Sequence, residues 1–212
     1  MILTVVFLFF SPDPNATLID LVFALSATSS NSFQAYNKMK DTVKQFIDKY
    51  GATAIHYSII VYGGQVLRVV NFNHTFPPSA NELKTAISNQ RSLSGGPVLK
   101  DALDETFRIF NETIGRPKAL KVLVVITDNN SENKKDSLSA AVKRLEEQIY
   151  PKGVLVISVA LGAVNRSELL VISPNPLDVL SVGTGINAGI LAERIMERIL
   201  RRKISKAGRK LG

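Results

Sequence analysis

The feature that most constrains the fold is a regular alternation between short apolar runs and amphipathic stretches. Residues 18–25 (LIDLVFAL) and 120–127 (LKVLVVIT) are almost wholly apolar, as strands buried on both faces of a parallel sheet are. Between them, residues 33–50 carry apolar side chains at helical spacing, with serines before the stretch and Gly51 after it as caps. This alternation predicts an α/β domain whose parallel sheet is covered by helices.

One exception to the parallel pattern is expected at an edge of the sheet. Residues 53–62 and 66–72 are two predicted strands joined by Gly63-Gly64, a two-residue hairpin signal that makes this pair antiparallel. Further strands are predicted at 153–161 and 176–182, and further helices at 81–89, 98–110, 137–150 and 186–202. The predicted fold class is a doubly wound α/β fold: a mostly parallel six-stranded sheet with one antiparallel edge strand and helices on both faces. We expect these residues to be buried in it: Leu21, Val22, Phe23, Leu123, Val125, Val156 and Ile157.

Three segments are predicted along the 212 residues. Residues 18–200 form the domain. Residues 1–17 are an apolar leader that contains ILTVVFLFF, a run with the length of a signal-peptide apolar region and too short to cross a bilayer. Basic residues are missing before that run, so a buried strand or a piece of a longer chain is the alternative. No transmembrane segment is expected.

Residues 201–212 are predicted to be a basic C-terminal tail. The formal net charge is +8, and the last fifteen residues hold seven Lys and Arg and no acidic residue, which leaves nineteen basic against eighteen acidic residues elsewhere. The positive charge therefore describes a tail and not a face of the domain, so no nucleic-acid partner is expected. We expect the tail to extend beyond the last helix, disordered or as a frayed helix end.

The chain has no cysteine, which excludes disulfides, thiolate metal sites and cysteine nucleophiles. Five Asn-x-Ser/Thr glycosylation acceptors occur, at Asn15, Asn73, Asn111, Asn129 and Asn165. Together with the leader, they predict a secreted glycoprotein. At least two of the last four asparagines are expected on exposed loops.

Ligands of open α/β sheets bind outside the carboxyl ends of the strands. Three predicted loops lie there: residues 26–30 (SATSS) after the first strand, 94–99 (SGGPVL) before a helix, and 128–131 (DNNS) after the central strand. These loops are the expected binding face.

The order and spacing of these segments resemble a von Willebrand factor type A domain. Residues 19–25 with their Ser/Thr-rich loop look like its opening strand, and residues 124–128 (VVITD) look like its central strand ending in aspartate. Gly95-Gly96 looks like its middle loop, and residues 153–162 look like its fifth strand. The resemblance covers residues 19–200. It implies an extracellular adhesion and matrix-binding module, located in the extracellular matrix, with collagens or other matrix glycoproteins as partners.

In that family the three loops hold a divalent cation through an Asp-x-Ser-x-Ser loop, a threonine and a distal aspartate. Carried over to this sequence, Ser26 stands in place of the first aspartate and Pro97 in place of the threonine. Thr28, Ser30 and Asp128 remain as candidate ligands. Mg²⁺ in proteins is usually held by one or two carboxylates, so we expect weak Mg²⁺ binding or none, and no required cofactor. The alternative is that the first loop only caps a helix and hydrogen-bonds to the aspartate.

No motif of a nucleotide-binding or hydrolytic enzyme is present: phosphate loop, dinucleotide fingerprint and nucleophile elbow are all missing. His56 lies in a predicted strand and His74 in a connecting loop, so both are expected to be structural. Asp20 lies too far from the first loop to replace its missing carboxylate. Carboxylate pairs on predicted helices are read as solvated helix faces: Asp101 with Asp104, and Glu146 with Glu147.

The leading prediction is a secreted, non-catalytic adhesion or matrix-protein-binding module. One alternative is a structural, self-associating matrix component whose basic tail binds acidic polymers. A second alternative is an intracellular assembly factor of the same fold, which the glycosylation acceptors count against. An enzyme is not expected.

Overall fold

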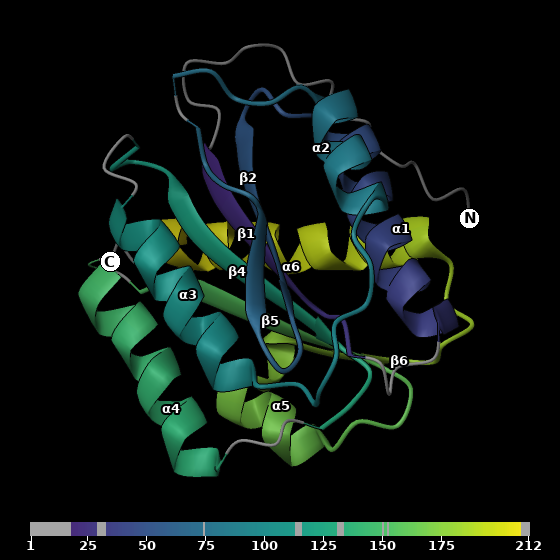
Figure 1. Ribbon diagram of the computed structural model, residues 1–212. Helices are drawn as coiled ribbons and strands as arrows, with labels where there is room; N and C mark the ends of the chain where they lie inside the picture. The colour runs from purple at the N-terminus through teal and green to yellow at the C-terminus, as the bar shows by residue number, and fades with distance from the viewer. Residues whose placement is uncertain are drawn as a thin grey trace, which may run out of the picture.

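The computed structural model describes residues 18–28, 33–73, 75–112, 116–130, 134–149, 151 and 153–208, with side chains as far as Arg201. A six-stranded sheet in the order β3-β2-β1-β4-β5-β6 forms its centre (Figure 1). The strands are β1 (Ile19–Ser26), β2 (Ile55–Tyr62), β3 (Val66–Val70), β4 (Leu120–Thr127), β5 (Leu155–Leu161) and β6 (Val179–Val182). Every neighbouring pair is parallel except β2 with β3, so the predicted fold class is confirmed.

Helices cover both faces of the sheet. They are α1 (Phe33–Tyr50), α2 (Ala80–Ser88), α3 (Leu99–Glu112), α4 (Lys135–Arg144), α5 (Arg166–Ile172) and α6 (Ala188–Gly208). Figure 1 shows helices on both sides of the sheet. The buried side chains of α1, α2 and α6 belong to the core cluster on one face, and those of α3, α4 and α5 belong to the cluster on the other. No helix in the described part of the chain is both long enough and apolar enough to span a bilayer.

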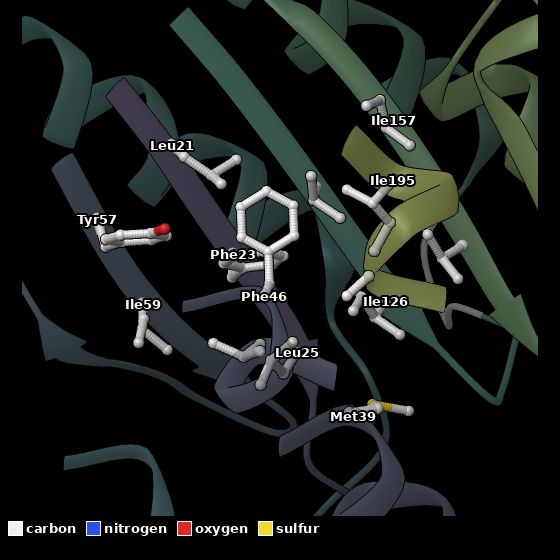
Figure 2. Packing of buried hydrophobic residues seen from close by; sticks show 14 of the residues in the cluster. Leu21, Phe23, Leu25, Met39, Phe46, Tyr57, Ile59, Ile126, Ile157 and Ile195 are labelled. Carbon is white, nitrogen blue, oxygen red and sulfur yellow. The ribbon is translucent and has the colours of Figure 1, made fainter. Parts of the chain in front are cut away.

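Edge-to-face aromatic contacts fix α1 on the sheet. Figure 2 shows Phe46 of α1 over Phe23 of β1, with ring centroids 5.4 Å apart and an interplanar angle of 78°. Tyr57 of β2 packs on the same ring at 6.3 Å and 85°. Such contacts stabilise beyond the area they bury, and they hold the last turns of α1 on the sheet. The seven residues predicted to be buried are between 0% and 4% exposed, which confirms that prediction.

A buried cluster of charges lies at the amino ends of β1 and β4. Asp20 and Lys121 are register partners on these strands, are 0% and 5% exposed, and form an ion pair. The Arg116 Nε lies 3.4 Å from the Asp20 carboxylate, and its Nη2 donates to the Ala54 carbonyl oxygen at 2.9 Å. Burial lowers the pKa of Arg116, and the charge of Asp20 opposes that shift. Buried charges persist when they are paired, as these are.

Several elements differ from the sequence prediction. The helix expected at 137–150 runs from Lys135 to Arg144 and continues as a π-helix, Leu145–Ile149. The strand expected at 176–182 begins as a 3₁₀ turn, Pro176–Asp178, because Pro176 favours a first helical position and Asn175 caps the Leu177 N–H at 3.1 Å. The last helix reaches Gly208, beyond the expected end at 202, in line with the high helix propensity of Lys, Arg and Ala.

The sequence pattern does not predict α5 at all. Asn165 caps this short helix by accepting a hydrogen bond from the Ser167 N–H at 2.9 Å.

The reading of Asp104 as solvated is wrong: its side chain is 19% exposed, and it pairs with Lys100 and Arg144. Asp101 and Glu147 are exposed, and Glu146 is half-buried. The predicted leader at 1–17 lies outside the described residues, as does the end of the predicted tail, at 209–212.

Candidate functional site

The candidate binding face lies at the carboxyl ends of β1, β2 and β4. Ser26 ends β1 and is the register partner of Tyr62, which ends β2, while Thr127 ends β4. These three polar side chains are 0%, 1% and 2% exposed. The strands therefore end in a layer of buried hydroxyl groups.

Backbone hydrogen bonds join the first loop to the middle loop. The Ala27 N–H donates to the Tyr62 carbonyl oxygen at 2.8 Å, and the Leu93 N–H donates to the Ala27 carbonyl oxygen. Thr28 and Leu93 form an isolated parallel bridge. The first loop is thus held between β2 and the segment that leads into α3.

The turn between β2 and β3 holds the middle loop from the other side. The Gly64 N–H donates to the Ser94 carbonyl oxygen at 3.0 Å, and the Val98 N–H donates to the Gly63 carbonyl oxygen at 3.1 Å. A Cβ on Gly64 would lie 2.8 Å from the Ser94 carbonyl oxygen, and one on Gly95, at φ +84°, would lie 2.9 Å from the Gly64 Cα. Both contacts require glycine. We call this contact the Gly64–Gly95 lock.

The predicted site residues are brought to this face only in part. Ser26, Thr28 and Pro97 are buried at their loops, and Asp128 is half-buried directly after β4. Ser30 lies outside the described residues. The described positions therefore lie in the loops at this end of the sheet, and their role as ligands stays a prediction.

The loop after β4 is organised by its own polar groups. The Thr127 hydroxyl donates to the Asn129 carbonyl oxygen at 2.7 Å and accepts from the Asn129 N–H at 3.2 Å. The Asn129 amide also donates to the Asp128 carboxylate at 3.4 Å. Asp128 therefore takes part in the polar contacts of this loop.

Glu168 of α5 is a second carboxylate near this face. It could not be found from the sequence, because the pattern does not predict α5. Burial raises the pKa of Tyr62, and the charges of Glu168 and Asp128 raise it further. The neighbouring hydroxyls of Thr127 and Ser26 act in the opposite direction. The Tyr62 phenol therefore stays protonated in the physiological range.

Among the described residues, no group of three or more His, Cys, Asp or Glu side chains could hold a metal ion. His56 is half-buried within β2, and His74 lies outside the described residues.

The glycosylation acceptors are distributed over the surface. Asn73 and Asn165 are exposed in loops, and Asn111 is exposed in the last turn of α3. Asn129 is half-buried, and Asn15 lies outside the described residues. The Asn165 side-chain oxygen caps α5, which leaves its amide nitrogen to carry a glycan.

Curated sequences include relatives from the extracellular matrix. The collagen alpha-6(VI) chain of Homo sapiens is 27% identical over 158 residues, covering 72% of this chain and 7% of that protein. Matrilin-3 of Gallus gallus is 24% identical over 170 residues, covering 76% of this chain and 35% of that protein. The chain thus spans only a small part of these relatives.

Solved structures share the fold. Proximal thread matrix protein 1 from the mussel byssus superposes with a TM-score of 0.70 at 20% identity, covering 85% of this chain and 45% of that one. The manganese-loaded Plasmodium vivax TRAP protein superposes with a TM-score of 0.68 at 14% identity, covering 85% and 74%. The family model of the von Willebrand factor type A domain matches residues 20–184, from the start of β1 to just beyond β6. This chain therefore belongs to the von Willebrand factor type A domain family.

Proposed function

We propose that this chain is a secreted, non-catalytic adhesion or matrix-binding module whose partner binding does not depend on a divalent cation. Family membership supports the binding role, and the similarity to a collagen chain and a matrilin supports the matrix setting. The exposed asparagines of the glycosylation acceptors support export. Its partners are collagens or other matrix glycoproteins.

The observation that carries the proposal is the chemistry of the loop positions where the family holds its cation. Ser26 is fully buried beside Tyr62 and brings no charge, and the buried Pro97 has no side-chain oxygen. Among the carried-over positions only Asp128 is a carboxylate. A divalent cation loses water when it binds and needs charged oxygen ligands in compensation. The residues present therefore do not fit a tightly held Mg²⁺, and the site is degenerate.

The described parts of the first and middle loops are joined by the chain itself. Backbone hydrogen bonds and the Gly64–Gly95 lock join the start of the first loop, the β2–β3 turn and the middle loop. A partner can be bound through direct contacts with this surface.

A matrix pull-down with and without chelator tests the proposal. Purified chain is incubated with an extracellular-matrix extract in EDTA or in Mg²⁺, and the bound fraction is compared. We expect equal retention in both. Loss of retention in EDTA would overturn the proposal. The pull-down in EDTA is repeated at high salt with a tail variant that carries Lys203→Gln, Lys206→Gln, Arg209→Gln and Lys210→Gln. Retention that persists comes from the domain, whereas retention that is lost comes from binding of acidic polymers by the tail.

A further inference from the structure

A hollow of about 560 Å³ lies between the start of α1 and the end of α2, beside the first loop. Figure 1 shows these two helices side by side. This volume lies within the range of ligand pockets in proteins. The residues that decide its chemistry are Thr28, Phe33, Tyr36, Lys40, Gln90 and Arg91.

The hollow is positively charged. Lys40 and Arg91 line it, and none of its lining residues is acidic. Within the described part of the chain neither cation forms an ion pair, whereas Lys44 and Lys49 of the same helix pair with Asp41 and Glu193. An anionic group that enters the hollow therefore finds two cations that are not held in ion pairs.

Lys40 is held in place while most of its donors stay available. Its Nζ donates to the Gln90 carbonyl oxygen at 3.2 Å and lies 5.0 Å from the centroid of the Tyr36 ring. An ammonium has three N–H donors, so two remain for a ligand. Fixing the side chain before binding reduces the entropy that a ligand must remove.

The hollow also offers apolar surface and an unsatisfied polar atom. Phe33 is 81% exposed at its rim, which is unusual for a large aromatic side chain. Tyr36 is 4% exposed, and its buried hydroxyl has no hydrogen-bond partner among the residues that the structure describes. A buried donor without an acceptor costs free energy, so a ligand oxygen beside it gains that hydrogen bond.

We propose that this hollow binds an acidic segment of a partner protein, with a carboxylate between Lys40 and Arg91 and a neighbouring apolar side chain against Phe33. The assignment rests on the proposed function, because it names the subsite through which a cation-independent module holds its partner. The lining favours a peptide over a sulfated glycan. Its two cations lie among amide side chains, which can donate hydrogen bonds to a peptide backbone and accept them from it. A site for a polyanion would instead carry a row of cations.

Peptide titration in EDTA tests the assignment. The probe is a fluorescein-labelled peptide of sequence Gly-Glu-Phe-Asp-Gly, and its amide analogue Gly-Gln-Phe-Asn-Gly is the charge control. We expect the acidic peptide to bind and the analogue to bind at least about tenfold more weakly. Lys40→Gln and Arg91→Gln should each weaken binding of the acidic peptide about tenfold. Lys135→Gln, the same charge change at the exposed start of α4 on the opposite face, should leave it unchanged.

Equal affinity for the two peptides, or an acidic-peptide affinity that is the same in the native chain and both hollow variants, would overturn the assignment. A heparin oligosaccharide that displaces the peptide and loses affinity in the same variants would show that the site takes a polyanion, which also overturns it. The matrix pull-down separates this failure from failure of the proposed function. If the Lys40→Gln, Arg91→Gln double variant is still retained on matrix in the presence of chelator, the proposed function is supported and the hollow is not the partner-binding site.

Discussion

The two ends of the central sheet bury polar groups in different ways. At the amino end, Asp20 is buried as a charged group with Lys121 and Arg116. At the carboxyl end, the buried groups of Ser26, Tyr62 and Thr127 are neutral hydroxyls. The first arrangement makes folding depend on charge pairing, whereas the second leaves the binding face stable without any charge at those positions.

The largest expected effect breaks the amino end. Asp20→Ala leaves two buried cations without their carboxylate, so the free energy of unfolding should fall by ~3–5 kcal/mol. Urea denaturation followed by circular dichroism measures this loss. Asp48→Ala, which removes the exposed partner of Lys84, is the control and should cost less than ~1 kcal/mol. Equal losses in both variants would contradict the claim that the amino end depends on its buried charge pairing.

Placing charge at the carboxyl end sharpens the comparison. Ser26→Asp with Pro97→Thr restores two ligand positions, so the Mg²⁺ affinity should rise at least ~10-fold over the native chain, as measured by calorimetry. A buried carboxylate without a cation is costly, so Mg²⁺ should also raise the Tm of this variant more than that of the native chain. A native chain that binds Mg²⁺ as tightly as the variant would show that the native ligands suffice.

Two buried or half-buried tyrosines, one near each end of α1, make the stability of the fold depend on pH. Burial raises the pKa of Tyr36 and of Tyr50 to about 12, and Glu193 and Glu197 add to the shift of Tyr50. Because the unfolded chain ionises near pH ~10, the folded state loses stability as the pH rises from there to about 12. The ultraviolet absorbance of phenolate, followed as the pH is raised, should show that both tyrosines ionise at a higher pH in the folded chain than in the unfolded chain. Tyr36→Phe and Tyr50→Phe should each remove part of the alkaline loss, and an unchanged profile in both would contradict the assignment.

The smallest effect is expected at Asp128. The proposed function assigns this carboxylate no cation to hold, and its side chain is half-buried, so Asp128→Ala should change retention on matrix by less than ~2-fold and stability by less than ~1 kcal/mol. Pull-down in Mg²⁺ and urea denaturation measure the two quantities. If Asp128→Ala reduces retention as much as the Lys40→Gln, Arg91→Gln double variant does, the Asp128 carboxylate contributes directly to partner binding and the prediction is wrong.

The fold could be predicted because its main signals are local. The apolar runs of β1 and β4 and the Gly63-Gly64 hairpin each lie within a few consecutive residues. The elements that were missed depend on single capping side chains: Asn165 starts α5, and Asn175 converts the first residues of an expected strand into a 3₁₀ turn.

The candidate site could be predicted only where loop positions follow strands. Ser26, Pro97 and Asp128 were located by carrying over the family's loop positions, and each lies in a loop beside the carboxyl ends of the strands. The hollow was not predicted, because Lys40 and Arg91 are brought together by the packing of α1 against α2. The pairing of Asp20 with Lys121 joins residues 101 positions apart, and both look like ordinary members of apolar strands in the sequence.

The Gly64–Gly95 lock bears on the speed of association. Loops that must become ordered on binding slow the productive encounter, whereas loops already closed by backbone hydrogen bonds leave only the orientation of the two surfaces to be found. For a partner that binds the β2–β3 turn and the middle loop we therefore expect an association rate constant on the order of 10⁵–10⁷ M⁻¹s⁻¹, without a slow ordering phase in these two segments. Differences in affinity between partners should then lie in how long each complex persists.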